Sequence, residues 1–269
     1  MDKQLKTIAI SNQKGGVGKT TTTINLGAAL AGADKTVLII DLDPQGNAST
    51  GLGIPPEDRK ITAYDVLVDG HDILEAIWET DVANVHIVPS TVDLSSADIE
   101  LMSNERRSFL LSRAIQDIRD ADYYDYVLID CPPSLNLLTI NAMVAADTVL
   151  VPLQSEFFAL EGLSQLMLTI REIRSTANKR LRIEGIVLTM FDRRNNLSQQ
   201  VEADARENLG DLVFQTMIPR NVRVSEAPSF AMPVLQYDPS STGAKAYKAL
   251  AIEIINKNTL KGGAAHGSG

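Results

Sequence analysis

Residues 13–21 are Gln13-Lys14-Gly15-Gly16-Val17-Gly18-Lys19-Thr20-Thr21. They follow a short apolar run, Ile8-Ala9-Ile10, and precede a segment of helical character at 24–30. Glycines let a backbone curl around a phosphate with its N–H groups pointing inward, and the following helix adds the positive end of its dipole. This arrangement predicts a phosphate-binding loop, with Lys19 on the β- and γ-phosphates and the Thr20 hydroxyl on Mg²⁺.

The loop departs from the usual G-x-x-x-x-G-K-[ST] spacing, because Gln13 stands where the first glycine is expected. It also contains a second lysine, Lys14, five residues before Lys19. The alternative interpretation is a glycine-rich surface turn beside two solvated lysines. The strand-like run before the loop and the helical segment after it favour the phosphate loop.

Short runs rich in β-branched residues alternate with longer helical patterns along the whole chain. Several runs are apolar almost continuously, which is typical of strands in a parallel sheet that helices cover on both faces. We expect strands at 7–11, 36–41, 85–88, 126–130, 148–153, 183–190 and 212–218, and helices at 19–31, 106–121, 135–146, 160–176, 198–209 and 243–256. The alternation predicts an α/β fold, a doubly wound and mostly parallel sheet with helices on both faces.

The composition limits the function classes. The 269 residues have a formal net charge of −9 and contain one cysteine, Cys131. One cysteine excludes an internal disulfide and a cysteine-ligated zinc or iron-sulfur site within a single chain. The negative charge argues against a globally basic nucleic-acid binder, although a local basic patch remains compatible with it.

Glycine and proline occur in local clusters, and no long linker separates two blocks. We therefore expect one domain over residues 1–257, followed by a flexible tail or an expression-tag remnant at 258–269. No apolar run approaches the ~18 residues that span a bilayer, and the start has no signal-peptide layout, so we expect a cytoplasmic protein without a membrane partner.

Two of the expected strands end in aspartates. Asp41 and Asp43 lie two residues apart, so they point the same way in an extended chain, and Asp130 closes another apolar run. The carboxyl ends of parallel strands line the crevice where open α/β sheets bind ligands, so we expect Asp130 to hold Mg²⁺ through water. The alternatives are an aspartate-rich turn before Pro44 and a helix cap at Asp130.

The segment Lys14-Gly15-Gly16-Val17-Gly18-Lys19-Thr20-Thr21 resembles the deviant Walker A motif of the ParA/MinD ATPase family. The segment 41–46, Asp-Leu-Asp-Pro-Gln-Gly, is similar to a second motif of that family. The resemblance implies ATP and Mg²⁺ as cofactors and catalytic roles for Lys14, Lys19 and Asp43. Lys14 would act on the nucleotide of a second subunit, Asp43 would orient the attacking water, and Asp41 would join Thr20 and Asp130 near the metal.

Segments 188–196 and 218–228 are similar to those of chromosomal ParA proteins, the branch that includes Soj. The likeness places Pro219, Arg220 and Asn221 beside the adenine. The nucleotide-binding residues would then be Lys14, Gly15, Gly16, Val17, Gly18, Lys19, Thr20, Thr21, Pro219, Arg220 and Asn221. It also assigns Arg194 and Arg223 to a surface that binds DNA. With two neighbouring arginines they form a candidate DNA-binding patch of Arg193, Arg194, Arg220 and Arg223, against the alternative of solvated charges in surface turns. Residues 154–162 are a candidate switch segment.

The resemblance as a whole implies a chromosome or plasmid partition ATPase. Such an enzyme binds ATP–Mg²⁺, forms a nucleotide-sandwich homodimer, binds double-stranded DNA without sequence preference and lies on the nucleoid. A ParB-type centromere-binding protein stimulates its slow hydrolysis and releases it. The alternative is an orphan ParA- or MinD-like positioning ATPase that acts on a protein cluster or a division regulator. A membrane-bound MinD-like role would need a basic amphipathic C-terminal helix, whereas 246–256 has the pattern of a packing helix followed by a glycine-rich tail.

Overall fold

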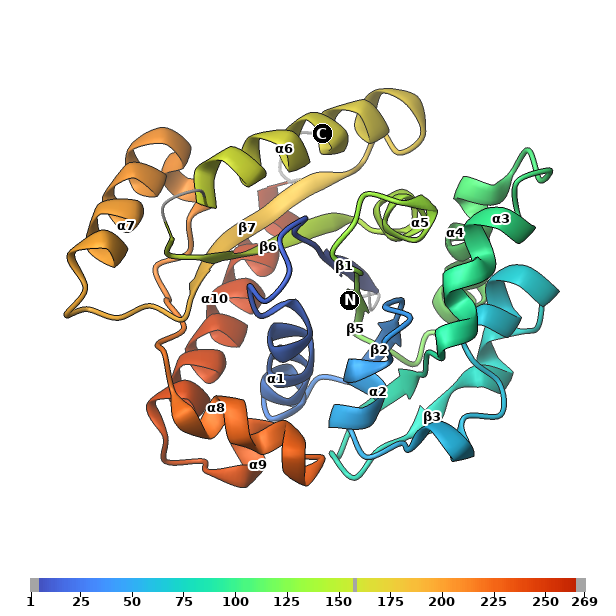
Figure 1. Cartoon of the computed structure of the whole chain (residues 1–269), viewed down its shortest axis with the longest axis horizontal. Helices are drawn as coiled ribbons and strands as arrows, with labels where there is room; N and C mark the ends of the chain where they lie inside the picture. The colour runs from blue at the N-terminus through green and yellow to red at the C-terminus, as the bar shows by residue number, and fades with distance from the viewer. Residues whose placement is uncertain (1–4, 157–158, 265–269) are drawn as a thin grey trace.

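The computed structural model describes residues 5–156 and 159–264. A seven-stranded sheet with the order β3-β4-β2-β5-β1-β6-β7 forms its centre (Figure 1). All neighbouring strands are parallel except β3 and β4. The strands are β1 (Lys6–Ile10), β2 (Val37–Asp41), β3 (Trp78–Glu79), β4 (Val85–Val88), β5 (Tyr126–Asp130), β6 (Thr148–Gln154) and β7 (Arg182–Thr189). The expected α/β fold class is confirmed.

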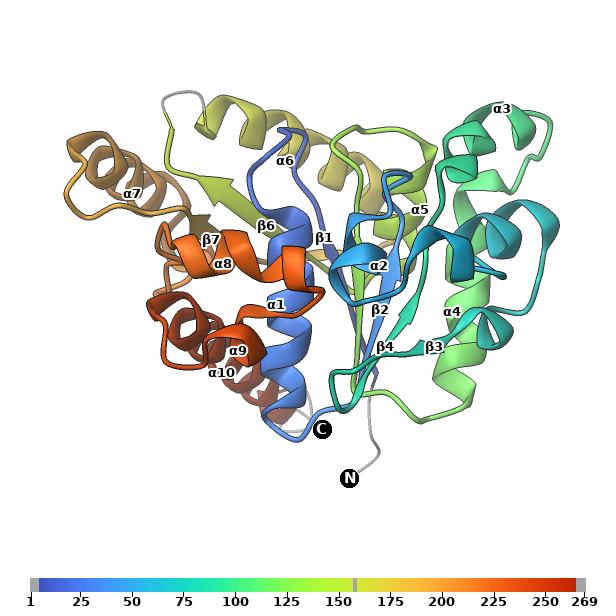
Figure 2. The ribbon, with the colours of Figure 1, turned by 60° about the horizontal axis from the view of Figure 1, so that its bottom comes forward.

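Helices cover both faces of this sheet (Figures 1 and 2). The longer helices are α1 (Lys19–Ala31), α4 (Leu110–Asp120), α5 (Leu137–Ala145), α6 (Ala159–Thr176), α7 (Asn196–Leu209) and α10 (Thr242–Ala264); the short ones are α2 (Asn47–Gly51), α3 (Ala97–Glu100), α8 (Val222–Glu226) and α9 (Val234–Tyr237). The α1 and α10 helices pack together over one face, whereas α4, α5 and α6 contribute to the core on the other. Successive side chains of β1 point into opposite cores: Ile8 and Ile10 belong to one core and Ala9 belongs to the other.

The expected strand at 212–218 is wrong. Two isolated bridges, at Val213 and at Pro219, and a hydrogen bond from the Ile218 N–H to the Leu188 oxygen at 2.8 Å join this segment to β7 and its continuation without forming a continuous strand. The backbone N–H groups of Gln215 and Thr216 donate to the Glu253 carboxylate on α10, at 2.8 and 3.0 Å. Because these two amides bond to a helix instead of a strand, the ladder is broken in its middle.

The C-terminal helix is longer than expected. We predicted its end at residue 256 and a flexible tail from 258, but α10 continues to Ala264. The last residues, 265–269, lie outside the described part of the chain. Within 5–156 and 159–264, we find no helix with the length and apolarity needed to cross a membrane.

The central strands decide where the site forms. β5 lies between β2 and β1, and all three are parallel, so their carboxyl ends meet at one edge of the sheet. The loop from β1 to α1 begins at this edge (Figure 2). The crevice at such an edge is where open α/β sheets bind ligands.

Candidate nucleotide site

The glycine-rich loop leads directly into α1, which begins at Lys19. Gly18 has φ 86°, a left-handed conformation that a residue with a Cβ rarely adopts. The ammonium group of Lys19 is mostly buried and donates to the backbone oxygen of Lys14 at 3.1 Å, so it folds back under the loop. The Thr189 hydroxyl at the end of β7 donates to the backbone oxygen of Val17 at 2.8 Å and anchors the loop from another strand.

The structure brings the three predicted aspartates together. Asp41 and Asp130 are paired across the β2–β5 register and are both fully buried. Asp41 accepts the backbone N–H and the hydroxyl of Ser49, at 2.9 and 2.7 Å, as well as the N–H of Asp43 at 3.2 Å. Asp130 accepts the Thr23 hydroxyl of α1 at 2.9 Å, which joins the end of β5 to the helix after the loop.

Burial dominates the electrostatics of this group. It raises the pKa of Asp41, and a hydrogen-bonded Ser49 only partly opposes the shift. It also raises the pKa of Asp130, and the neighbouring Asp41 carboxylate adds to the shift. Burial lowers the pKa of Lys19, while Asp130 opposes that effect. A cluster of buried acids beside a buried lysine favours the binding of a cation that offsets the negative charge.

The residues present fit a magnesium ion. The second carboxylate oxygen of Asp130, Oδ2, is buried and has no hydrogen-bond partner within the described residues. The hydroxyl of Thr20 also interacts with this carboxylate. Hydroxyl and carboxylate oxygens are the ligands that Mg²⁺ prefers, and the ion commonly keeps part of its water shell. Thr20 and Asp130 could therefore hold Mg²⁺, with Asp130 acting through a water molecule.

The side chain of Lys14 has a different partner from that of Lys19. The Lys14 side chain is 44% exposed and forms an ion pair with Glu156, which follows β6. Sequence reasoning did not predict this partner, although Glu156 falls within the candidate switch segment 154–162. Of that segment, Phe157 and Phe158 lie outside the described residues.

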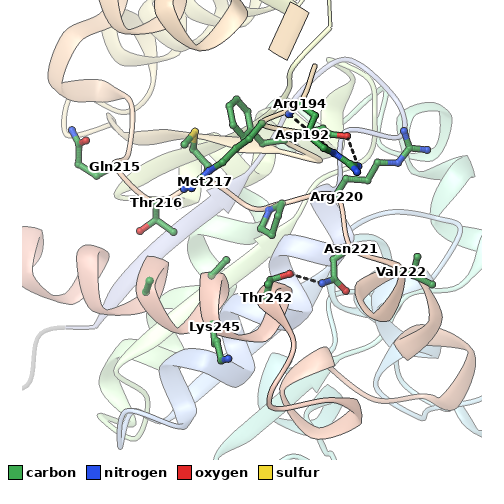
Figure 3. Close-up of a pocket in the computed structure, with 15 residues that line it drawn as sticks. Asp192, Arg194, Gln215, Thr216, Met217, Arg220, Asn221, Val222, Thr242 and Lys245 are labelled. Carbon is green, nitrogen blue, oxygen red and sulfur yellow. Dashed lines mark hydrogen bonds and ion pairs between the residues drawn. The ribbon is translucent and has the colours of Figure 1, made fainter. Parts of the chain in front are cut away.

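The predicted adenine-side residues Pro219, Arg220 and Asn221 line a cavity of about 870 Å³ (Figure 3). Asn221 also caps α8, since its side-chain oxygen accepts the N–H of Arg223 at 2.8 Å and its amide donates to Thr242 at 2.7 Å. Pro219 bridges to Phe191, two residues beyond the Thr189 that anchors the loop. The structure thus connects the phosphate loop to this cavity through the end of β7.

The four predicted DNA-binding arginines are exposed, and Arg193, Arg194 and Arg220 line the same cavity. Two of the four have acidic partners: Arg194 pairs with Asp192 at 3.2 Å, and Arg223 pairs with Glu226 at 2.9 Å and Asp238 at 3.5 Å. Figure 3 shows the ion pair of Arg194 with Asp192 among the residues that line the cavity. These carboxylates offset part of the positive charge of the patch.

Three further residues support the site, and sequence reasoning missed them: Thr23, Ser49 and Arg59. The buried Arg59 donates to the backbone oxygens of Ile54 and Ser90 and to the Thr50 hydroxyl, so it ties the segment after α2 to the end of β4. Thr23 belongs to a run of threonines that could have attracted attention. No pattern in the sequence predicts the hydrogen bond from Arg59 to the backbone oxygen of Ser90.

Comparisons with known proteins agree with this geometry. A family model described as an AAA domain matches residues 5–183. The chain is 57% identical to the chromosome partitioning protein ParA of Caulobacter vibrioides, over 94% of this chain and 95% of that protein. It is 51% identical to the sporulation initiation inhibitor protein Soj of Bacillus subtilis, over 93% of this chain and 98% of that protein. The chain belongs to the ParA/Soj family of partition ATPases.

A solved structure extends the comparison to the bound nucleotide. The cobyrinic acid a,c-diamide synthase of Mycobacterium smegmatis, solved with ADP and magnesium, has a TM-score of 0.81 and 34% identity, covering 92% of this chain and 93% of that chain. The expected family and ATPase class are confirmed for this ParA/Soj chain. The roles of individual site residues stay predictions.

Proposed function

We propose that this ParA/Soj chain is an ATP- and Mg²⁺-dependent partition ATPase that dimerises around bound nucleotide, holds DNA without sequence preference and leaves it after hydrolysis. The observation on which this depends is the buried Lys19 of the glycine-rich loop beside three aspartates at the ends of β2 and β5. Its 57% identity to a ParA protein favours partition over the positioning role that we kept as the alternative.

Each residue of the site has a role in this proposal. The loop N–H groups and Lys19 bind the phosphates, and Thr20 and Asp130 hold the metal. When bound, Mg²⁺ neutralises charge on the phosphates. Asp43 is close to fully buried and lies two residues beyond Asp41, where its carboxylate orients a water molecule for attack. Phosphoryl transfer to water needs mainly this positioning and charge stabilisation.

Lys14 supports dimerisation. Its own backbone oxygen accepts the Lys19 ammonium, while its side chain points out to the half-exposed rim. The site therefore has one lysine for its own phosphates and a second that can reach a phosphate of another copy. Occupancy by ATP then favours the dimer by mass action.

DNA binding follows from the arginine patch in this proposal. Guanidinium groups pair with phosphates in a bidentate geometry, and binding through phosphates is independent of base sequence. One copy contributes only four arginines, two of which have acidic partners. A dimer doubles the patch, which gives a physical reason for DNA affinity that depends on ATP and for association with the nucleoid.

The test is the ATPase rate measured with duplex DNA and with a basic N-terminal peptide of a ParB-type protein, separately and together. We expect slow basal turnover and a stimulation by the two together that exceeds the sum of their separate effects. Turnover that responds to neither would contradict the partition role and favour the positioning ATPase.

A further inference from the structure

The loops that follow β1 and β6 lie side by side, because these strands are parallel neighbours in the sheet. The side-chain amide of Asn12 donates to the backbone oxygen of Pro152 at 2.7 Å and fixes the start of the contact. Further out, the ammonium group of Lys14 meets the carboxylate of Glu156, with 44% and 46% of the two side chains exposed. The lysine is thus held by a residue of its own chain, 142 positions away in sequence.

Two polar side chains next to this ion pair have buried atoms that lack hydrogen-bond partners among the described residues. These atoms are Gln13 Nε2 and Ser155 Oγ. Buried polar atoms nearly always have partners in native proteins, and each exception costs free energy. One orphan precedes Lys14 and the other precedes Glu156. Each loop thus leaves one buried polar group without a described partner next to its member of the ion pair.

Lys14 cannot bind Glu156 and the phosphate of a second copy equally well at the same time. An ammonium group is a compact positive charge. If it carried the Glu156 carboxylate with it to a triphosphate, the two negative groups would repel each other. Glu156 therefore competes with the phosphate of a second copy for Lys14. We propose that Glu156 is a positioning residue that keeps Lys14 in a resting place within one chain, and that this ion pair must break before the nucleotide-bridged dimer forms. The proposal rests on the proposed action of Lys14 in trans.

The expected size of the effect is modest. A largely exposed ion pair changes an equilibrium constant by about fivefold at most. A symmetric dimer breaks two such pairs, so the dimer dissociation constant changes by up to about 25-fold. Salt weakens the pair, and the effect should shrink accordingly.

The experiment is sedimentation velocity of the full chain with a non-hydrolysable ATP analogue and Mg²⁺, comparing wild type with Glu156→Gln. We expect the variant to dimerise with a dissociation constant about three- to 25-fold lower at low salt. The ratio of the two constants should approach one as the salt concentration rises, which a purely structural role of Glu156 would not produce. Glu156→Asp, which keeps the charge, should lie between the two.

Glu202→Gln is the matched control, because Glu202 forms an ion pair with Arg206 at 2.9 Å on α7, away from the loop. It should dimerise as wild type does. An unchanged or weaker dimer in Glu156→Gln would overturn the proposal while leaving ATP-driven dimerisation intact. If wild type and Glu156→Gln both stay monomeric, the proposed function itself fails, and this inference fails with it.

Discussion

At the scale of single residues, the site combines groups that are costly to bury. Asp41 and Asp130 lie fully buried and face each other across two strands, and Lys19 is nearly as buried. Burial raises the pKa of both acids and lowers the pKa of the lysine. Burying these groups costs stability, and in the proposed function the binding of a nucleotide would restore it.

Lys19→Ala should weaken ATP binding by about 10- to 100-fold, because it removes a charge-assisted contact to phosphate. Equilibrium binding of a fluorescent ATP analogue measures the loss. Lys60→Ala, at an exposed lysine outside the site, is the control and should bind as wild type does. Equal affinity in Lys19→Ala and wild type would remove Lys19 from the phosphate site.

Asp130→Asn should stabilise the nucleotide-free protein by about 1 kcal/mol at neutral pH, because it removes a buried carboxyl group whose raised pKa favours the unfolded state above about pH 4 and whose second oxygen has no described partner. For a chain of this size the melting temperature would rise by about 2–4 °C. The same variant should lose most of the gain in nucleotide affinity that Mg²⁺ provides. Thermal unfolding with and without nucleotide and metal tests both effects, and a lower melting temperature of the nucleotide-free variant would contradict this account.

At the scale of elements, the turn between β2 and α2 brings the backbone of Gly46 close to Arg59 and Ser90. Gly46 has φ 61°, and a Cβ at this position would lie 2.9 Å from the backbone oxygen of Ser90 and against the Arg59 guanidinium. The turn after Asp43 thus requires glycine for two independent reasons.

Gly46→Ala should lower the free energy of unfolding by about 1–3 kcal/mol, from backbone strain and steric overlap together. Chemical denaturation measures the change. Gly162→Ala is the matched control, because Gly162 lies in α6 and its added Cβ would meet nothing within 4 Å. The control should be neutral or slightly stabilising, and a Gly46→Ala protein as stable as wild type would show that this turn adjusts freely.

The strands and the loop could be predicted from sequence because their signals are local. Apolar runs mark β1, β2 and β5, and the glycine-rich segment between β1 and α1 predicts the start of α1 at Lys19. The failures have non-local causes. Residues 212–218 have a strand pattern, but Glu253 on a distant helix binds two of their amides. The partners of Arg59 and Lys14 likewise come from other parts of the chain.

At the scale of the whole molecule, the proposed DNA-binding patch of one copy carries little net positive charge. Acidic neighbours offset Arg194 and Arg223, and the total formal charge is −9. The account therefore predicts that DNA affinity belongs to the dimer. Two copies acting together double the number of phosphates that the patch neutralises, and the affinity becomes strongly dependent on salt.

Arg193→Ala should weaken binding of the ATP-bound protein to duplex DNA of any sequence while leaving dimerisation intact. If each Arg193 contacts one phosphate, a dimer loses two contacts, and the slope of log K against log salt should become shallower by about 1.8. Fluorescence anisotropy with labelled DNA over a salt series measures the slope. Unaltered affinity and slope would exclude Arg193 from the DNA surface.

The most direct test of the central claim is the mass of the protein in solution when it is saturated with a non-hydrolysable ATP analogue and Mg²⁺. The account predicts that wild type sediments as a dimer, that Lys14→Ala binds the analogue yet stays monomeric, and that both are monomers with ADP. A wild-type protein that remains monomeric with saturating analogue, or a Lys14→Ala variant that dimerises as readily, would contradict it.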